Sequence, residues 1–428
     1  MKIYCRQFSR MRFHEWIATL NLVLILVGYP FAASLLTPLG YNAFQSQLIT
    51  VPYRLFALFI SLICVLVGMQ KKAMPSPMPR MVYLFMGCFA LCILRLFVDF
   101  SNDRTGFAAA EAFRTWGLVV SSFFAALSVL FSFKIIDFRK ALFLILILSF
   151  WVMIVNKIFN SATTADLILD HSMERQVGSA ALFSIAYSNV GVNAAIICFY
   201  VFLSKYYNIL YKSLVVPLCC LSFVVMLSTG SRSPVLAFSM TLIFWIASGM
   251  RVKFIFYSIA ALFAVIFYML RFTLVDMLVE YVPLLGQRFH AMLYNDFYSG
   301  RDLLVADGLQ QCISSPILGS STINVKTGVT SLIGYHTYIV DALAYFGVIG
   351  GGLFLFLLGY MFFISISMFS ARRIIPNFWI NVMLLNVLFF KTIGSGLFHI
   401  DQMFSTLIIL GICFYSEYYK RLYGRAIR

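Results

Sequence analysis

Long apolar segments are the feature that most limits what this chain can fold into. About 20 apolar residues in a helix cross the hydrocarbon core of a bilayer, because each residue adds about 1.5 Å. The 428-residue chain contains such runs at 16–36, 51–70, 81–99, 115–133, 141–159, 179–203, 214–230, 234–250, 254–271, 342–369, 378–396 and 402–417. The sequence therefore predicts an all-α polytopic membrane protein with about 12 transmembrane helices, forming a single integral membrane domain over residues 1–428.

The composition agrees with this class. Hydrophobic residues make up 62% of the chain and charged residues 11%, whereas a soluble domain has about 25% charged residues. The net charge is +16, which in a soluble protein would point to nucleic-acid binding. In a membrane protein the same excess can arise from topology alone, so the positions of the charges decide its meaning.

Basic residues gather in alternate connections between the predicted spans. They lie in the segments 1–12, 71–80, 134–140, 205–212, 251–253, 372–373 and 420–428. By the positive-inside rule these segments are cytoplasmic, and an even number of spans puts both termini on that side. The net charge therefore indicates orientation, and nucleic acid is not an expected partner.

Three segments on the predicted outer side are long enough to carry chemistry: 100–114, 160–178 and a third, which is the longest. It covers residues 272–335, between the ninth and tenth spans, and we expect it to form part of an active site. A helix is predicted over 302–314, since apolar residues recur at helical spacing and Ser315-Pro316 stops it. A second helix is predicted to begin at His336 and to continue into the tenth span.

Arginine predominates among the basic residues outside the cytoplasmic segments, and its planar guanidinium binds phosphate through two hydrogen bonds. Arg232 lies in a Gly-Ser-Arg-Ser-Pro turn between two spans. The serine hydroxyls and turn amides there suit a phosphate at headgroup depth. An arginine that only extends to the interface is an equally weighted alternative.

Two further arginines stand beside predicted helices. Arg175 precedes the sixth span, and Arg301 opens the helix of the outer loop. Each has an acidic neighbour, Glu174 and Asp302 respectively. A local ion pair is therefore at least as good an interpretation as ligand binding.

His336 is the candidate general base. An imidazole with a pKa near 6.5 exchanges protons at working pH, although a single interfacial histidine is more often structural. Motifs for a metal-dependent or nucleotide-driven reaction are missing from the sequence. We therefore expect no metal and no cofactor, and any catalysis must use a donor that is already activated.

These elements together resemble the bacterial O-antigen polymerase and O-antigen ligase superfamily, which are membrane glycosyltransferases of the GT-C type. The typical motif is a His, a small polar residue, about nine others and Gly-x-x-Gly, matched here by His336-Thr337 and by Gly-Val-Ile-Gly at 347–350. A Ser-Arg turn is matched at Arg232. An arginine that opens a loop helix ending in Pro-x-x-Gly is matched by Arg301 and 316–319.

The resemblance implies a GT-C-like fold in the bacterial inner membrane, with the active site facing the periplasm. It also implies a donor glycan on undecaprenyl diphosphate. Arg232 and Arg301, with Arg175, would stabilise the charge on the diphosphate leaving group, and His336 would take the proton of the acceptor hydroxyl. The lipid bilayer is a partner, and a chain-length-regulating membrane protein is a further partner to expect.

Three functions remain open from the sequence. Thr337 and an outer loop of moderate length favour a polymerase, which adds the glycan to another lipid-linked repeat unit. The alternative is a ligase, which transfers the glycan to lipid A-core and usually has Asn, Ser or Gln after the histidine. A flippase for lipid-linked oligosaccharides is less favoured, because two similar halves are not seen and Arg95 and Lys391 are the main deep charges.

Overall fold

The structure is a computed structural model of the chain. It describes residues 11–39, 46–75, 78–102, 109–160, 184–205, 207–229, 231–249, 269–270, 272–281, 286, 290, 301–320, 323–324, 331–332, 335, 337–370, 375, 377–394, 397 and 402–426. The predicted sites that fall elsewhere, His336 and Arg175, lie outside the described residues.

Helices make up nearly all of the described chain. They are α1 (Phe13–Val23), the π-helical turn η2 (Leu24–Gly28), α2 (Tyr29–Leu36), the 3-10 turn η3 (Thr37–Leu39), α3 (Ser46–Gln70), α4 (Arg80–Asn102), α5 (Ala109–Ser132), α6 (Phe138–Asn160), α7 (Ser184–Leu203), α8 (Ile209–Ser228), α9 (Arg232–Gly249), α12 (Arg301–Ser314), α13 (Tyr338–Ser370), α14 (Trp379–Gly394) and α15 (Gln402–Ala426). A two-stranded antiparallel pair, β1 (Ile323–Asn324) and β2 (Ser331–Leu332), lies in the predicted outer loop and was not expected from the sequence.

The predicted class is confirmed. Among the described residues, 7 helices are long and apolar enough to cross a membrane, and α1, η2 and α2 together form the first of them. Shorter apolar helices cover 117–132, 233–248 and 379–394. The predicted span 254–271 lies almost wholly outside the described residues, so the number of twelve spans stays a prediction.

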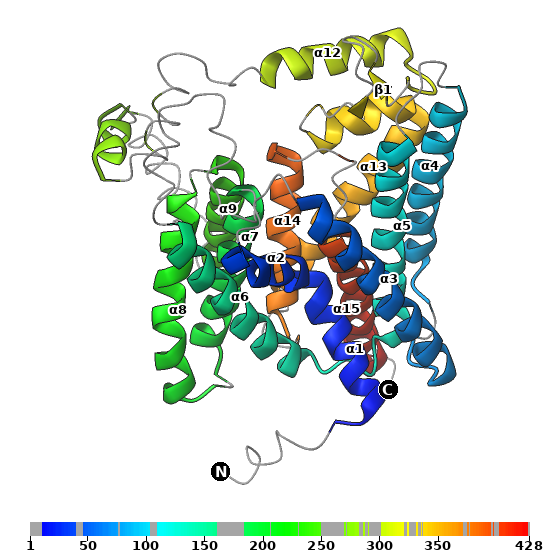
Figure 1. The fold of residues 1–428 in the computed structure, drawn as a ribbon. Coiled ribbons are helices and arrows are strands. Elements are labelled where there is room, and N and C mark those ends of the chain that lie inside the picture. The colour runs from blue at the N-terminus through cyan, green and yellow to red at the C-terminus, as the bar shows by residue number, and fades with distance from the viewer. Residues whose placement is uncertain are drawn as a thin grey trace.

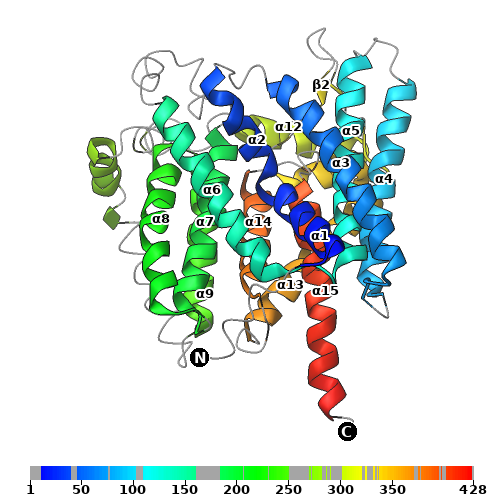
Figure 2. The ribbon, with the colours of Figure 1, turned by 60° about the horizontal axis from the view of Figure 1, so that its bottom comes forward.

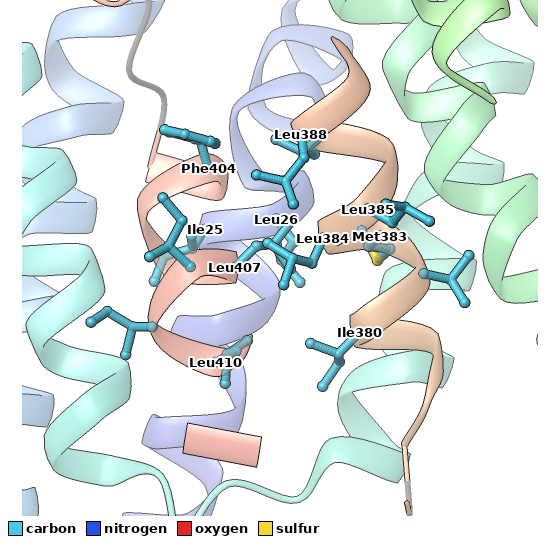
Figure 3. Packing of buried hydrophobic residues seen from close by; sticks show 14 of the residues in the cluster. Ile25, Leu26, Ile380, Met383, Leu384, Leu385, Leu388, Phe404, Leu407 and Leu410 are labelled. Atoms are coloured by element: carbon cyan, nitrogen blue, oxygen red, sulfur yellow. The ribbon is translucent and has the colours of Figure 1, made fainter. Parts of the chain in front are cut away.

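The helices form two groups around a central layer. Figures 1 and 2 show α3, α4 and α5 on one side, α6 to α9 on the other, and α1, α14 and α15 between them. Apolar side chains from distant parts of the sequence interlock in this centre, as Figure 3 shows for Leu26, Leu384 and Leu407. All three are buried, which makes the first and last helices parts of one core.

A polar contact joins three helices inside the bundle. The Asn21 side-chain amide of α1 donates to Ser128 Oγ of α5 at 2.7 Å and accepts from Ser61 Oγ of α3 at 3.2 Å. All three residues are at most 1% exposed. Such contacts hold helices together in lipid, where apolar side chains alone give little preference for protein over acyl chains.

Contacts between the connections define two ends of the bundle. At one, the backbone N–H of Lys134 donates to Ala73 O, and that of Asp137 donates to Thr19 Oγ1, both at 3.0 Å. The rings of Phe143 and Tyr207 meet there as well. The connections α3–α4, α5–α6 and α7–α8 are therefore at this end, which we call the basic end because the lysines and arginines of 71–80, 134–140 and 205–212 lie in them.

The other end holds the starts of α9 and α13. Helix α8 begins at the basic end, and only three residues join it to α9, so α9 begins at the far end. The rings of Phe244 in α9 and Phe369 in α13 are 5.0 Å apart, which places the late parts of both helices together. Figure 1 shows α12 lying across this far end, away from the start of α1 and the end of α15. We call it the α12 end.

The Asn21 contact gives a testable prediction for the fold. Asn21→Ala removes the amide that links α1, α3 and α5, and we expect it to lower the free energy of unfolding by about 1 kcal/mol. The measurement is the melting temperature of the detergent-solubilised protein. Leu66→Ala, on an exposed part of α3, is the control, and an equal loss in both variants would contradict the role of the contact.

Candidate active site at the junction of α12 and α13

A break inside α13 organises the α12 end. Gly347 has φ 61° and ψ −166°, a backbone conformation open essentially to glycine alone. Helical hydrogen bonding fails at such a point, so the amides of the next turn and the carbonyls of the preceding one need other partners. In an apolar environment each group left without a partner would cost several kcal/mol.

The segment that follows α12 supplies those partners. Pro316 O accepts from the backbone N–H of Val348 at 2.8 Å, and Ile317 O accepts from that of Ile349 at 3.5 Å. In the other direction, Ala344 O accepts from the backbone N–H and the hydroxyl of Ser320, at 2.8 and 3.1 Å. The Pro-x-x-Gly segment thus fits into the break as a substitute for the missing helical turn.

Close backbone approach explains the glycine that ends this segment. Gly319 has φ 75°, and a side-chain carbon there would collide with the backbone of Tyr345 and Phe346. A side-chain carbon on Gly347 would likewise collide with the carbonyl of Ile317. The two glycines of the predicted motifs therefore face each other where two segments of the chain meet.

The start of α13 is capped by the residue that follows the candidate base. Thr337 Oγ1 accepts from the backbone N–H of Val340 at 3.3 Å, and Thr337 O accepts from that of Asp341 at 3.1 Å. This is the usual arrangement of an N-cap, which Ser and Asn perform as well as Thr. The predicted helix start at His336 is therefore shifted to Tyr338, because the cap takes the preceding place.

Asp341 binds the chain on both sides of the α12 end. Its Oδ1 accepts from the backbone N–H of Tyr335 at 2.8 Å, and its Oδ2 accepts from that of Leu397 at 2.6 Å. The residue is 1% exposed. One carboxylate thus joins the end of the outer loop, the first turns of α13 and the connection from α14 to α15.

Lys391 of α14 is the basic residue near this carboxylate. It is 1% exposed, its charge attracts that of Asp341, and its Nζ lies 5.1 Å from the centre of the Phe404 ring. Buried charges in a membrane protein are expected to face the interior and to pair, and both residues do so. Electrostatic attraction between Asp341 and Lys391 therefore links α13 and α14.

Tyr335, which precedes His336 in the chain, is held on several sides. Its ring stacks on that of Tyr345 at 5.8 Å, and it is 3% exposed. Burial raises the pKa of Tyr335 to about 12, and the negative charges of Asp341 and Asp307 act in the same direction. The phenol therefore stays neutral at physiological pH, and we assign it a structural role.

Two of the three predicted arginines begin helices at the α12 end. Arg232 is the first residue of α9 and Arg301 the first of α12, and the predicted helix at 302–314 is confirmed with one more residue at its start. The backbones of both residues are described and their side chains are not, so their approach to each other and to His336 stays a prediction. Arg175 and His336 lie outside the described residues.

The sequence analysis missed Asp341. A carboxylate among apolar residues at the start of a span is a signal that could have drawn attention to it, because such charges are costly and usually functional or paired. Its partners, however, are the backbone amides of Tyr335 and Leu397, one of them 56 residues away. No sequence motif marks a backbone amide as a partner.

Comparison with models of known protein families gave no match, and comparison with curated proteins gave none either. The chemical interpretation of the α12–α13 junction therefore depends on its own residues.

Gly347 provides a test of the junction. Gly347→Ala forces a side chain into a glycine-only conformation and against Ile317 O, so we expect unfolding to become easier by at least about 2 kcal/mol. Gly352→Ala, in the same helix with nothing within 4 Å of the added carbon, is the matched control. Thermal unfolding in detergent measures both, and similar melting temperatures would contradict the proposed fit.

The attraction between Asp341 and Lys391 gives a second test. Asp341→Asn removes the charge that attracts Lys391 and weakens the hydrogen bonds from the Tyr335 and Leu397 amides, and we expect it to destabilise the protein by about 2 kcal/mol. Lys391→Met removes the other charge. If the two charges interact, the double variant should lose less stability than the sum of the losses in the two single variants. Melting temperatures of the four proteins measure this coupling, and strict additivity would show that the two charges do not interact.

Proposed function

We propose that the chain is a metal-independent glycosyltransferase that uses a glycan on undecaprenyl diphosphate, most specifically an O-antigen polymerase. The observation that carries this proposal is the α12–α13 junction. Two motif segments of the suggested superfamily, 316–319 and 347–350, are widely separated in sequence and hydrogen-bond to each other. The third, the turn before Arg232, lies at the same end of the bundle.

The distribution of charge supports an orientation for the protein. The lysines and arginines of the connections α3–α4, α5–α6 and α7–α8 lie at one end of the bundle. Helix α12 and the starts of α9 and α13 lie at the opposite end. By the positive-inside rule we assign the basic end to the cytoplasm and the α12 end to the periplasm of a bacterial inner membrane. A polymerase that uses exported, lipid-linked repeat units needs its site on that side.

The chemistry follows from the leaving group. Diphosphate departs readily when positive charge stabilises it, so arginines can replace a metal ion. Arg232 and Arg301 are the residues we assign to this role, with Arg175 as a further contact. Both described arginines begin helices, where backbone N–H groups add to the attraction for an anion.

His336 is assigned to the acceptor. As the anomeric carbon of the donor is attacked, the acceptor hydroxyl loses its proton to the imidazole, and undecaprenyl diphosphate leaves with the bonding electrons. Asp341 would act as a positioning residue, because it binds the Tyr335 amide before His336 and donates its own N–H to Thr337 O after it. The chain on both sides of the histidine is thereby fixed to one residue.

Thr337 and the length of the outer loop are the two features that bear on the choice between polymerase and ligase. Thr337 caps a helix, and Ser or Asn would do the same, so its identity is weak support for either acceptor. The moderate length of the outer loop remains in favour of the polymerase. The lipopolysaccharide of a deletion strain separates the two. A single repeat unit on the core indicates a polymerase, and loss of all O-antigen with lipid-linked polymer left over indicates a ligase.

The deep charges give little support to a flippase. Arg95 donates to Asp99 at 3.2 Å within α4, so its charge is compensated inside one helix. Lys391 is attracted to Asp341, which is itself bound to two backbone amides. Both arrangements hold structure in place, whereas a transport path needs charges that line an opening between helices.

The decisive experiment uses purified protein and a lipid-diphosphate glycan. We expect longer glycan chains and released undecaprenyl diphosphate, with turnover reduced at least about a hundredfold by His336→Ala and by Arg232→Ala. The matched controls are His14→Ala and Arg80→Ala at the basic end, which should keep wild-type turnover. Unchanged turnover in the site variants would contradict the assignment of residues. Absence of any transfer by the wild type, with either acceptor, would contradict the function.

A further inference from the structure

The outer surface of α12 is divided into two flanks of different chemistry. Leu309 and Ile313, one turn apart, are 48% and 79% exposed. The other flank presents Gln310 and Ser314, which are also exposed. The face of α12 that is turned toward the bundle carries Gly308, which packs against Tyr335 and Val340. The apolar flank therefore lies outside the protein core. A row of large apolar side chains is not expected on a helix that faces only water.

The apolar flank continues past the end of α12. Ile317 and Leu318 are 63% and 72% exposed, and Val348 and Ile349, just after the break in α13, are 67% and 62% exposed. The backbone hydrogen bonds between 316–317 and 348–349 bring the two segments that carry these side chains together. The four residues thus connect the surface of α12 to that of a membrane-spanning helix.

Below the break, α13 presents apolar side chains along its exposed side. Leu353, Phe356 and Phe363 are 41%, 60% and 55% exposed, as expected for a surface in contact with acyl chains. Residues 348–369 extend over about 33 Å at 1.5 Å each, which matches the hydrocarbon thickness of about 30 Å. The first turns of α13, above Gly347, are mostly buried in protein. A hydrocarbon core of this thickness would extend from the end of α13 to the break at Gly347.

We infer that α12 lies in the membrane–water interface and that bilayer lipid covers its apolar flank, formed by Leu309, Ile313, Ile317 and Leu318. The continuity of this flank with the lipid-facing side of α13 identifies the partner. Figure 1 shows α12 crosswise to the long helices, as an interfacial helix must be. The polar flank, with Gln310 and Ser314, then faces water.

The inference is independent of the proposed glycosyl transfer, since it concerns only the placement of the helix. If both hold, the interfacial position puts the first residue of α12, Arg301, at the depth of lipid headgroups. A diphosphate carried on a polyprenyl chain would lie at the same depth. The loop helix would then bring its arginine to the donor without removing the donor from the bilayer.

Depth-dependent quenching tests the placement. Tryptophan is introduced as Ile313→Trp on the apolar flank and as Gln310→Trp on the polar flank, and each protein is reconstituted in bilayers with and without lipids brominated on the acyl chains. The chain has 5 native tryptophans, so the wild-type signal is subtracted. We expect the tryptophan at 313 to lose at least about twice as large a fraction of its emission as that at 310, because interfacial helices bury their apolar face about 5–10 Å into the bilayer.

Two results would overturn the inference. Equal quenching at both positions would show that α12 does not lie with one flank in the lipid. Weak quenching at 313, together with a dimer mass in detergent and cross-linking between copies, would show that a second chain covers the flank. Leu309→Trp and Ser314→Trp repeat the comparison one turn away, so a folding defect in a single variant does not decide the outcome.

Discussion

Satisfaction of backbone hydrogen bonds at the break in α13 is the constraint on which the α12 end depends. A helix that crosses lipid cannot leave amides and carbonyls without partners, so a glycine-only conformation at Gly347 is tolerable only where another segment binds the open groups. Residues Pro316, Ile317 and Ser320 do this with their own backbone and one hydroxyl. The outer loop is thereby fixed to the membrane domain, and α12 takes its position from this attachment.

Asp341 extends the same principle to the neighbouring segments. Its carboxylate accepts from two backbone amides, Tyr335 before α13 and Leu397 after α14, and its charge attracts Lys391. A buried charge of this kind is retained only where hydrogen bonds and an opposite charge compensate for lost hydration. Tyr335, Thr337 and the segment that follows α12 are thereby all hydrogen-bonded to α13.

Much of the architecture could be predicted because it depends on local properties. Apolar length identified the helices from α1 to α9 and from α13 to α15, and Ser315-Pro316 correctly placed the end of α12. The start of α13 was misplaced by two residues, since Thr337 caps the helix and the sequence pattern does not distinguish a cap from the residue before it. The short β1–β2 pair was missed because two-residue strands leave no periodic signal.

The sequence by itself determined that the chain is a helical membrane protein, which segments form its helices and which connections carry positive charge. These are properties of consecutive residues, and transfer into lipid selects for them directly. Only the tertiary structure decided that 316–320 completes the hydrogen bonds of α13 and that Asp341 holds Tyr335 and Leu397. The backbone contacts of 316–320 with α13 join residues 24 to 32 positions apart, and Asp341 binds an amide 56 positions away. Backbone amides and carbonyls are the same in almost every residue, so which of them meet is decided by the fold.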